Sequence, residues 1–534
     1  MIFYPNDSTA IYPDLLEIDV EEIIVGLESE FWTSVDLINA YTQRIREVSW
    51  LNAVTEINPD ASSIAQTLDA ERSAGHLRGI LHGVPILIKN NIATMDKMNN
   101  TAGSYSLLGA TVPRDSTVVA KLRAAGLIIL GKANMSQWAQ FRSSKINTTS
   151  GWSAYGGQVT GAYYPNMSPS GSSSGSSVAT SIGLAMAALG TETDGSIVVP
   201  CSVSNLVGIK PTVGLTSRSL IIPLSEHQDS VGPIARSVKD AAYILSIIAG
   251  KDHFDNYTSA QPFNVPPDYT QALDLAALKN ARIGVPRNAM DREENAIRRP
   301  VLNAFEKAIQ IIQGAGATVV ENTNFSAWDE YVIDSRAPLG NKSIVLGADF
   351  VSDLGQYLSQ LTSNPQNITS LADVSAFTQN SPSEQHSTHD TSSWDQALAL
   401  KFDNNDAHFW QSYQHRLYFG GEGGVVGALE KYNLDALIMP TDYSPDLPAA
   451  AGLPVITVPL GFYPSDYPIY KDPNGLVIIG PNIPFGISFL GRKWSEEKLI
   501  GLAYAYEQIT HTRQKRNPVI LPKTQITDVL KSYI

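Results

Sequence analysis

Apolar and polar side chains alternate along this chain with helical spacing in some segments and with the pattern of buried strands in others. Over residues 33–48 the apolar positions recur at helical spacing, and Thr33 followed by Asp36 is typical of a helix N-terminus. Residues 84–88 form a short, unbroken apolar run, which predicts a buried strand. Because the run stops at Lys89, a basic side chain is predicted at the end of that strand.

Helical and strand patterns follow one another through the rest of the chain. Helices are predicted at residues 116–125, 296–313 and 495–508, and buried strands at residues 127–130, 281–285, 317–320, 434–439, 455–458 and 485–489. Alternation of this kind is typical of α/β proteins. The sequence therefore predicts the α/β class, with a large, mostly buried sheet flanked by helices.

Two polar stretches interrupt this alternation. Residues 143–177 are dense in Gly, Ser, Asn and Tyr, and residues 361–395 are equally polar, so both are predicted to be loops or lids over a site. Residues 178–189, which follow the first stretch, are small and apolar and favour a close-packed helix. Neither stretch is predicted to be an interdomain linker, because strand and helix patterns resume after both.

Composition and charge exclude several classes of function. The net charge of −14 opposes binding to nucleic acid or to anionic lipid, and no apolar run approaches the roughly 20 residues that span a bilayer. The single cysteine, Cys201, excludes an internal disulfide, and the nine histidines show no metal-ligand spacing. We therefore expect a soluble protein that acts on a small molecule or a peptide, with no nucleic acid, membrane or metal involved.

The compartment stays open. Residues 1–19 carry acidic and polar side chains instead of a basic segment followed by an apolar one, so no leader is visible and a cytoplasmic location is expected. Glycosylation sequons would instead suit a secreted protein whose leader had been removed. They include those at Asn6, Asn147, Asn256, Asn324, Asn341 and Asn367.

The Gly/Ser-rich region contains two turns that could carry chemistry. The first is Ser-Gly-Ser-Ser-Ser-Gly-Ser-Ser at residues 170–177, and the second is Gly-Thr-Glu-Thr-Asp-Gly-Ser at residues 190–196. A serine on a glycine-flanked turn exposes its hydroxyl, and the backbone N–H groups before it can converge on one point, as an oxyanion requires. A Gly/Ser stretch is also typical of a flexible linker, but a linker rarely runs directly into a buried segment and a second such turn.

Several motifs, taken together and in order, resemble the amidase signature family. They are Pro85-x-x-x-Lys89 and the segments 131–134, 170–176, 190–196, 208–212 and 230–233. The separation of 24 positions between Ser172 and Ser196 is also similar to that of the family. The resemblance extends over roughly residues 30–250 and returns at residues 451–458 and 486–491.

The resemblance implies a single large amidase domain over residues 1–534. Its fold would be a central mixed β-sheet with helices on both faces. The core signature region would cover about residues 80–240, and a variable insertion at about residues 327–424 would supply much of the substrate pocket. The oligomeric state implied is a monomer or a homodimer.

The family also implies a role for each residue of the two turns. By resemblance, Ser196 is the nucleophile, Ser172 is a bridging serine that follows a cis peptide bond from Gly171, and Lys89 is the base. A lysine acts as a base only where its pKa is lowered, and the end of an apolar strand would supply the necessary burial. The implied oxyanion and substrate-binding residues are Thr193, Asp194, Gly195 and Ser173, together with the N–H of Ser196. No cofactor is implied, and the acyl-enzyme would be released by water.

The two turns depart from the commonest family pattern. Ser170 and Ser174 stand where glycine is usual, and Glu192 and Asp194 replace more frequent residues. The resulting Thr-Glu-Thr-Asp-Gly-Ser turn is similar to that of the peptide amidases, which hydrolyse the C-terminal amide of peptides. The Asp194 side chain could contact a substrate N–H or cap a helix. Peptide amides are therefore favoured as substrates, and aryl and aliphatic amides stay open.

Three alternatives are compatible with parts of this pattern. Residues 171–175 also match Gly-x-Ser-x-Gly, the nucleophile elbow of α/β-hydrolases, which would make Ser173 the nucleophile, although the preceding residues predict no strand. A glutaminase subunit of an amidotransferase and a non-catalytic binding relative would share the fold. The presence of Lys89, Ser172 and Ser196 argues against a non-catalytic protein, and the peptide-amidase-like turn favours a standalone hydrolase.

Overall fold

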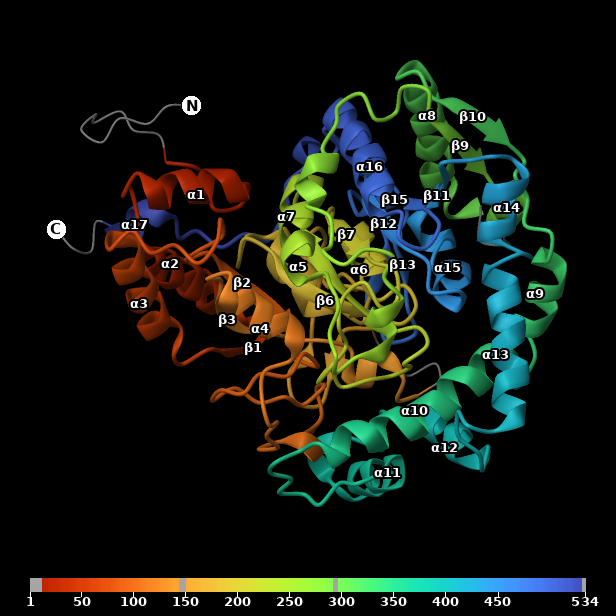
Figure 1. The fold of residues 1–534 in the computed structure, drawn as a ribbon, viewed down its shortest axis with the longest axis horizontal. Helices are drawn as coiled ribbons and strands as arrows, with labels where there is room; N and C mark the ends of the chain where they lie inside the picture. The colour runs from red at the N-terminus through yellow and green to blue at the C-terminus, as the bar shows by residue number, and fades with distance from the viewer. Residues whose placement is uncertain (1–11, 144–149, 292–295, 531–534) are drawn as a thin grey trace.

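The structure is a computed structural model that describes residues 12–143, 150–291 and 296–530. A mixed sheet of eleven strands forms its centre (Figure 1). Along the sheet the order is β1-β3-β2-β6-β8-β7-β12-β15-β11-β9-β10. The strands are β1 (Val54–Ile57), β2 (Pro85–Lys89), β3 (Ile128–Ala133), β6 (Ala188–Glu192), β7 (Val207–Lys210), β8 (Ser230–Ala235), β9 (Arg282–Val285), β10 (Thr318–Glu321), β11 (Ala436–Pro440), β12 (Val455–Phe462) and β15 (Pro484–Leu490). Two hairpins lie outside this sheet, β4 (Trp152–Ser153) with β5 (Gly157–Gln158) and β13 (Tyr470–Lys471) with β14 (Val477–Ile479). The sequons at Asn6 and Asn147 fall outside the described residues.

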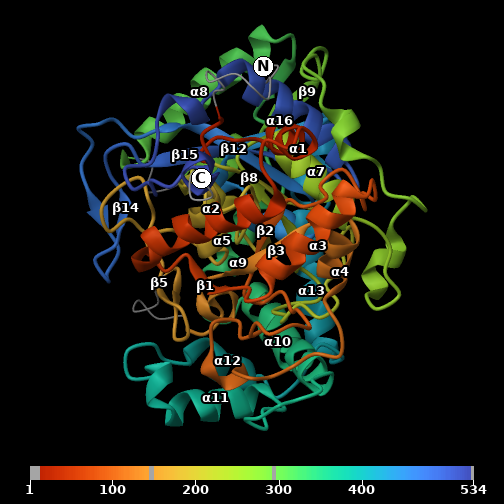
Figure 2. The same cartoon turned by 90° about the vertical axis from the view of Figure 1, so that its left-hand side faces the viewer.

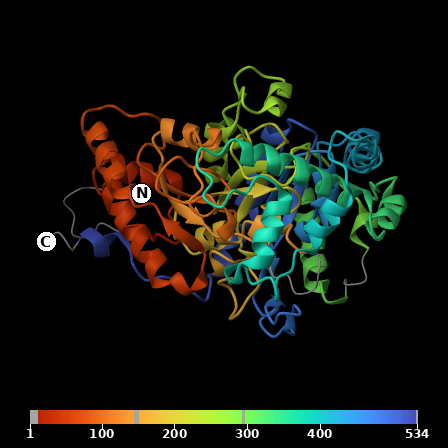
Figure 3. The same cartoon turned by 90° about the horizontal axis from the view of Figure 1, so that it is seen from below.

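Helices flank the sheet, which confirms the predicted α/β class. The longer ones are α1 (Val20–Glu28), α2 (Ser34–Glu47), α3 (Ala61–Ser73), α4 (Thr117–Ala124), α5 (Ser174–Ser181), α7 (Val238–Ile248), α8 (Arg299–Gly314), α9 (Trp328–Ser335), α10 (Asn341–Ser359), α11 (Leu371–Asn380), α12 (Ser392–Ala399), α13 (Ala407–Gly420) and α16 (Glu496–Thr510). The shorter ones are α6 (Val198–Val203), α14 (Val425–Lys431), α15 (Asp446–Ala450) and α17 (Ile526–Leu530). Figure 2 shows α2 and α3 in front of the end of the sheet that carries β1, β2 and β3, with α1 above them. From below, the segment from α10 to α12 covers the underside of the molecule (Figure 3).

The helix predicted at residues 33–48 is α2, and its first turn shows why it begins there. The Asp36 N–H donates to Thr33 Oγ1 at 3.1 Å, and the Thr33 N–H donates to Asp36 Oδ2 at 2.8 Å. This reciprocal pair satisfies two of the N–H groups that a helix start leaves without partners. The prediction from the Thr33 and Asp36 spacing is therefore confirmed.

The parallel pairing of β2 with β6 positions the predicted site. Leu87 of β2 pairs with Ala188 of β6, and the two strands run in the same direction. The carboxyl ends of parallel neighbours meet at one edge of a sheet, so Lys89 at the end of β2 lies beside the end of β6. The strand β8 runs antiparallel to β6 and pairs Ser230 with Glu192, which brings the start of β8 to the same edge.

The helix predicted over residues 178–189 is wrong. The helix α5 ends at Ser181, Gly183 takes a left-handed backbone with φ of 68°, and β6 begins at Ala188. A strand that is buried on both faces carries no polar alternation, so its apolar run could not be separated from that of the helix by periodicity. The segment therefore contains the end of a helix, a turn and a central strand.

The polar stretch at residues 361–395 also differs from the prediction of a loop. It contains α11 and the first part of α12. Ser370 begins α11 by accepting the N–H of Asp373, and the helix buries Leu371 and Val374 while most of its other side chains are polar. The few buried apolar positions on these short helices were too sparse to stand out from the polar composition.

The turn at Gly183 gives a test of this part of the fold. In Gly183→Ala the new Cβ would lie 2.4 Å from the backbone oxygen of Leu15, and the residue would keep a positive φ. We expect the free energy of unfolding, measured by urea denaturation, to fall by about 2 kcal/mol or more. Gly355→Ala is the control, because a Cβ on that glycine of α10 meets nothing within 4 Å, and it should stabilise by about 0.5–1 kcal/mol. Equal effects of the two changes would contradict the assigned turn.

Candidate active site

Lys89 is fully buried at the end of β2. Its Nζ donates hydrogen bonds to Ser172 Oγ at 2.8 Å, to Thr191 Oγ1 at 2.8 Å and to Thr191 O at 3.0 Å. Thr191 belongs to β6, the parallel neighbour of β2. The sheet edge therefore brings Lys89 and Ser172, two of the three residues of the predicted triad, into direct contact.

The surroundings of Lys89 favour its neutral form. Burial lowers the pKa of Lys89 from 10.5 to about 7, although the carboxylates of Asp229 and Glu192 act in the opposite direction. An amine with a pKa near neutrality is partly unprotonated at neutral pH and can then accept a proton. Lys89 therefore has both the position and the protonation equilibrium that a base requires.

Ser172 and Ser173 join the two Gly/Ser turns. The peptide bond between Gly171 and Ser172 is cis, and Ser172 is fully buried. The Ser173 N–H donates to Ser196 O at 3.0 Å, so the first turn is tied to the second. Ser173 Oγ donates to Thr191 O at 3.1 Å and is buried, which directs this hydroxyl toward β6 and away from solvent.

The position of Ser173 also argues against the nucleophile elbow. That motif requires a buried strand immediately before an exposed serine. Residues 168–173 are irregular, and the Ser173 side chain has no exposed surface. Ser173 joins the turns, whereas the sequence had predicted it as a substrate contact.

Glu192 organises the turn that carries Ser196. Its carboxylate accepts the N–H groups of Gly195 at 2.8 Å, Ile197 at 2.7 Å and Val198 at 3.0 Å. Gly195 takes a φ of 76° where the chain reverses before α6, a conformation that a larger residue rarely adopts. The turn therefore presents Ser196 at the N-terminal end of α6.

The occupied Gly195 N–H changes the expected oxyanion site. Because that N–H is already donated to Glu192, it has no hydrogen left for a ligand. Among the residues that the structure describes, no protein acceptor is seen for the N–H groups of Thr193, Asp194 or Ser196. These three donors of the same turn are the ones available to an oxyanion.

Ser196 opens onto a cavity of about 400 Å³. About 7% of the serine surface is exposed, so its hydroxyl can meet a ligand that enters the cavity. The turn at residues 193–196 and Gly171 form one wall. The other lining residues are Ala139, Gln140, Phe141, Ser150, Ser170, Val199, Leu224, Lys342, Leu346 and Pro445. Lys342 and Leu346 belong to α10, within the segment 327–424 that was predicted to supply pocket walls.

A model of the family described as Amidase matches residues 36–448. The chain belongs to the amidase family. An Arthroderma benhamiae protein named as an amidase is 51% identical over 540 residues, covering 97% of this chain and 90% of that protein. A protein of Arabidopsis thaliana named as an amidase is 36% identical, covering 93% of this chain and 91% of its own length.

Among solved structures, the native peptide amidase from Stenotrophomonas maltophilia is similar to this amidase over nearly its whole length. The two chains are 36% identical, and the match covers 95% of this chain and 99% of the other with a TM-score of 0.81. The amidase signature fold expected from the sequence is therefore confirmed.

A charged network in this amidase lies on one wall of the cavity. Asp194 forms an ion pair with Lys342, whose Nζ also lies 2.9 Å from Asp446 Oδ1. Asp446 is held in turn by Arg416 at 2.9 Å and by the Tyr331 hydroxyl at 2.5 Å. Burial alone would raise the pKa of Asp446, but Arg416 and Lys342 together hold it well below its usual range.

Sequence reasoning missed most of this network. Asp194 was singled out because it precedes the nucleophile, but Lys342, Arg416 and Asp446 carry no motif. Lys342 and Arg416 stand on α10 and α13, far along the chain from the Gly/Ser turns. Only the folded arrangement brings them together next to Asp194, and of the three Lys342 lines the cavity. The Asp194 side chain therefore meets a protein cation, which neither predicted role had included.

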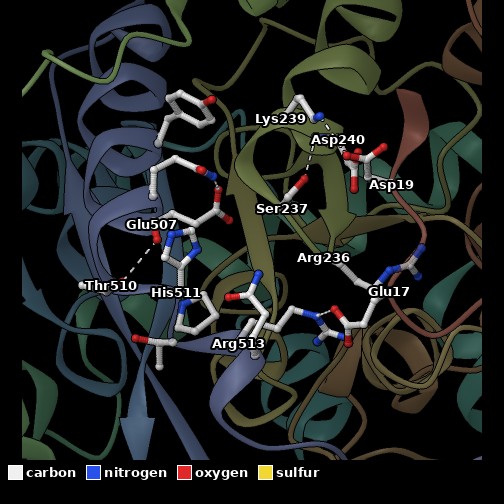
Figure 4. Close-up of a pocket in the computed structure, with 15 residues that line it drawn as sticks. Glu17, Asp19, Arg236, Ser237, Lys239, Asp240, Glu507, Thr510, His511 and Arg513 are labelled. Carbon is white, nitrogen blue, oxygen red and sulfur yellow. Dashed lines mark hydrogen bonds and ion pairs between the residues drawn. The ribbon is translucent and has the colours of Figure 1, made fainter. Parts of the chain in front are cut away.

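A separate polar cavity of about 240 Å³ lies between α7, α16 and the segment before α1 (Figure 4). Its charged side chains largely satisfy one another: Arg513 pairs with Glu17, and Lys239 pairs with Asp19. Glu507 accepts the N–H of Val238 at 3.0 Å and thereby caps α7. This cavity contains none of the predicted site residues and is a structural junction between helices.

Within residues 12–143, 150–291 and 296–530, no helix is both long enough and apolar enough to cross a membrane. Nor do three or more His, Cys, Asp or Glu side chains gather there in a group that could hold a metal ion.

The Arg416 ion pair gives a test of the charged network. Arg416 is almost fully buried, so Arg416→Met would leave the partly buried carboxylate of Asp446 with fewer partners. We expect a loss of about 3 kcal/mol in the free energy of unfolding, measured by urea denaturation. Lys498→Met is the control: the Lys498 and Asp435 pair is exposed and 3.4 Å apart, and its loss should cost less than about 0.5 kcal/mol. A small loss for Arg416→Met would show that the network is not holding Asp446 as described.

Proposed function

We propose that this amidase hydrolyses carboxylic amides through an acyl-enzyme, with Ser196 as nucleophile, Ser172 as proton relay and Lys89 as base. The observation that carries this proposal is the 2.8 Å hydrogen bond between Lys89 Nζ and Ser172 Oγ, made by a lysine without exposed surface. A lysine in that position is costly to keep charged and well placed to take a proton. The hydrogen bond from the Ser173 N–H to Ser196 O keeps the two serine turns adjacent.

The acylation step follows from this arrangement. Neutral Lys89 accepts the Ser172 hydroxyl proton as Ser172 accepts the proton of Ser196. The Ser196 oxygen forms a bond to the amide carbon, and the carbonyl electron pair moves onto oxygen. When that pair returns, the C–N bond breaks and the nitrogen leaves with a proton that passes back from Lys89 through Ser172.

Deacylation repeats the same transfers with water. A water molecule loses a proton along the relay while its oxygen adds to the ester carbon of the acyl-enzyme. Collapse of this second intermediate releases the carboxylic acid and returns the proton to Ser196. In both steps the N–H groups of Thr193, Asp194 and Ser196 are the proposed donors to the oxyanion. Each such donor can stabilise the transition state by about 3 kcal/mol.

Peptide C-terminal amides are the proposed substrates. Support comes from the similarity to a protein named peptide amidase and from the shape of the cleft. The catalytic cavity shares Ser150, Ser170 and Val199 with a second cavity of about 290 Å³, so there is room for an acyl group longer than a simple amide. The walls combine polar groups with apolar side chains such as Leu224 and Leu346, as a peptide backbone with side chains requires.

A substrate panel tests the proposal directly. Ammonia or amine release would be measured over peptide amides, aryl anilides and aliphatic amides, with kcat/KM highest for the peptide amides. Ser196→Ala should abolish release because the attacking oxygen is lost, and Lys89→Ala should reduce kcat by about 10⁴-fold or more, since removing one member of a triad costs that much. Full activity in Ser196→Ala, or glutamine as the preferred substrate together with a copurifying partner, would overturn the proposal.

The pKa of Lys89 sets the expected pH dependence. Below about 7 the amine is protonated and cannot act as a base, so kcat/KM should rise as pH increases through about 7 and then level off. Replacing the buried histidines His82 and His227 by Gln, one at a time, should leave this rise of kcat/KM with pH in place while the protein stays folded. If the rise disappears with either histidine, that histidine is the base instead.

A further inference from the structure

Asp229 joins the nucleophile turn, residues 193–196, to the loop that precedes β8. Its carboxylate accepts the Thr193 hydroxyl at 2.5 Å through Oδ1. The other oxygen, Oδ2, accepts the N–H groups of Leu224 at 2.7 Å and Ser225 at 3.1 Å. Asp229 is about 9% exposed, so water competes little for these hydrogen bonds.

The sheet register explains why Asp229 meets Thr193. Glu192 and Ser230 are the final partners of antiparallel β6 and β8. Thr193 is the residue after Glu192, and Asp229 is the residue before Ser230, so the two follow as the next pair beyond the strands. Gln228, also in this loop, donates from Nε2 to Thr193 O at 3.3 Å. The hydroxyl and the carbonyl of Thr193 are both held, and its N–H remains for the oxyanion.

We propose that Asp229 is a positioning residue of this amidase: by holding Thr193, it aims the Thr193 N–H at the oxyanion that forms when Ser196 adds to the amide carbon. This inference rests on the proposed function. The negative charge reaches the carbonyl oxygen only as the bond from Ser196 forms. A fixed N–H at that point therefore stabilises the transition state more than the bound substrate, so its misplacement lowers kcat more than it raises KM.

The helix α10 braces the loop that contains Asp229. Ser225 Oγ donates to Asp349 Oδ2 at 2.5 Å, and His227 Nδ1 lies 2.9 Å from Asp349 Oδ1. The Glu226 N–H donates to Asp353 Oδ2 at 2.6 Å. Because α10 is packed against this loop through two aspartates one helical turn apart, the loop is fixed on the side opposite the nucleophile turn.

Glu192 and Asp229 hold different parts of the same turn. Glu192 accepts N–H groups at and after Gly195, whereas Asp229 takes the side chain of Thr193 at the entry. Without Asp229 the entry residue would keep only the weaker contact from Gln228 and could rotate its peptide plane. Such a rotation would move the Thr193 N–H while leaving Lys89 and Ser172 in contact.

The test uses the smallest change that removes the contact. Thr193→Val deletes the hydroxyl with little change of shape and keeps the backbone N–H. We expect kcat on the best amide of the panel to fall by about 10- to 100-fold, with KM changed less than about 3-fold. This loss is smaller than the loss of kcat on removing an oxyanion donor completely, because the Thr193 N–H remains but is less well placed. Thr193→Ser keeps a hydroxyl and should recover most of kcat. Asp229→Asn should resemble Thr193→Val, and the double variant should be no slower than the slower single variant.

An inhibitor supplies a readout that a loss of stability would not produce. An N-acyl amino aldehyde adds the Ser196 hydroxyl across its carbonyl and forms a hemiacetal whose oxygen occupies the oxyanion site, whereas the corresponding alcohol cannot form this bond. Aldehyde binding should weaken in Thr193→Val by about the factor lost in kcat, and alcohol binding should stay unchanged.

Asp240→Asn is the matched control. Asp240 is about 1% exposed and accepts the N–H of Val20 at 3.0 Å, but it makes no contact with the nucleophile turn or with the loop of Asp229. It should lower stability and leave kcat of the folded protein as it was. An unchanged kcat and aldehyde affinity in Thr193→Val, with wild-type protein that cleaves amides, would overturn the role of Asp229. If the wild-type protein cleaves no amide in the panel, it is the proposed function that fails.

Discussion

The burial of Lys89 is the constraint on which the site depends. An ammonium group without access to water is costly unless its hydrogens are used, and Lys89 uses them on Ser172 and on two oxygens of Thr191. Those acceptors are in reach because β2 and β6 run parallel as neighbours and end at one edge. A different strand order would leave a lysine at the end of an apolar strand without partners. The same burial brings its pKa to about 7 and so makes the amine available as a base.

The turn that carries Ser196 is a second region where hydrogen bonds replace solvent. Glu192 is buried and accepts three backbone N–H groups from the turn and the start of α6. A carboxylate of this kind compensates its desolvation with charge-assisted hydrogen bonds. Asp229 holds the other end of the turn through Thr193. With both ends held by acidic side chains, the N–H groups of Thr193, Asp194 and Ser196 are left without a protein acceptor among the described residues.

Much of this arrangement was accessible from the sequence where local rules apply. The apolar run before Lys89 gave its place at a strand end, and Thr33 with Asp36 gave the start of α2. The rules failed where two elements share one composition: residues 178–189 are mostly small and apolar because they pass from α5 to a strand buried on both faces. They failed again at residues 361–395, where α11 buries only a few apolar side chains.

The missing part of the site has a different cause. Lys342 and Arg416 meet Asp194 and Asp446 across large separations in sequence, and no local pattern encodes such a meeting. The same holds for Thr193 and Asp229, which are 36 positions apart and become neighbours only through the register of β6 and β8. Ion pairs and register contacts of this kind depend on the packed fold, so the motifs could point to the proposed reacting groups without identifying the residues that hold them.

The contacts of Lys89 and the wall opposite Ser196 come from different parts of the fold. The hydrogen bonds of Lys89, Ser172 and Ser173 all lie within the sheet edge and its adjoining turns, whereas the wall opposite Ser196 comes partly from α10. Changes to Lys342 or Leu346 would alter the shape and charge that a substrate meets without breaking any contact of Lys89. The middle of the same helix differs in this respect, because Asp349 and Asp353 contact the loop of Asp229. The helix α10 therefore connects the substrate wall to the turn that carries Ser196, and a displacement along it would affect both.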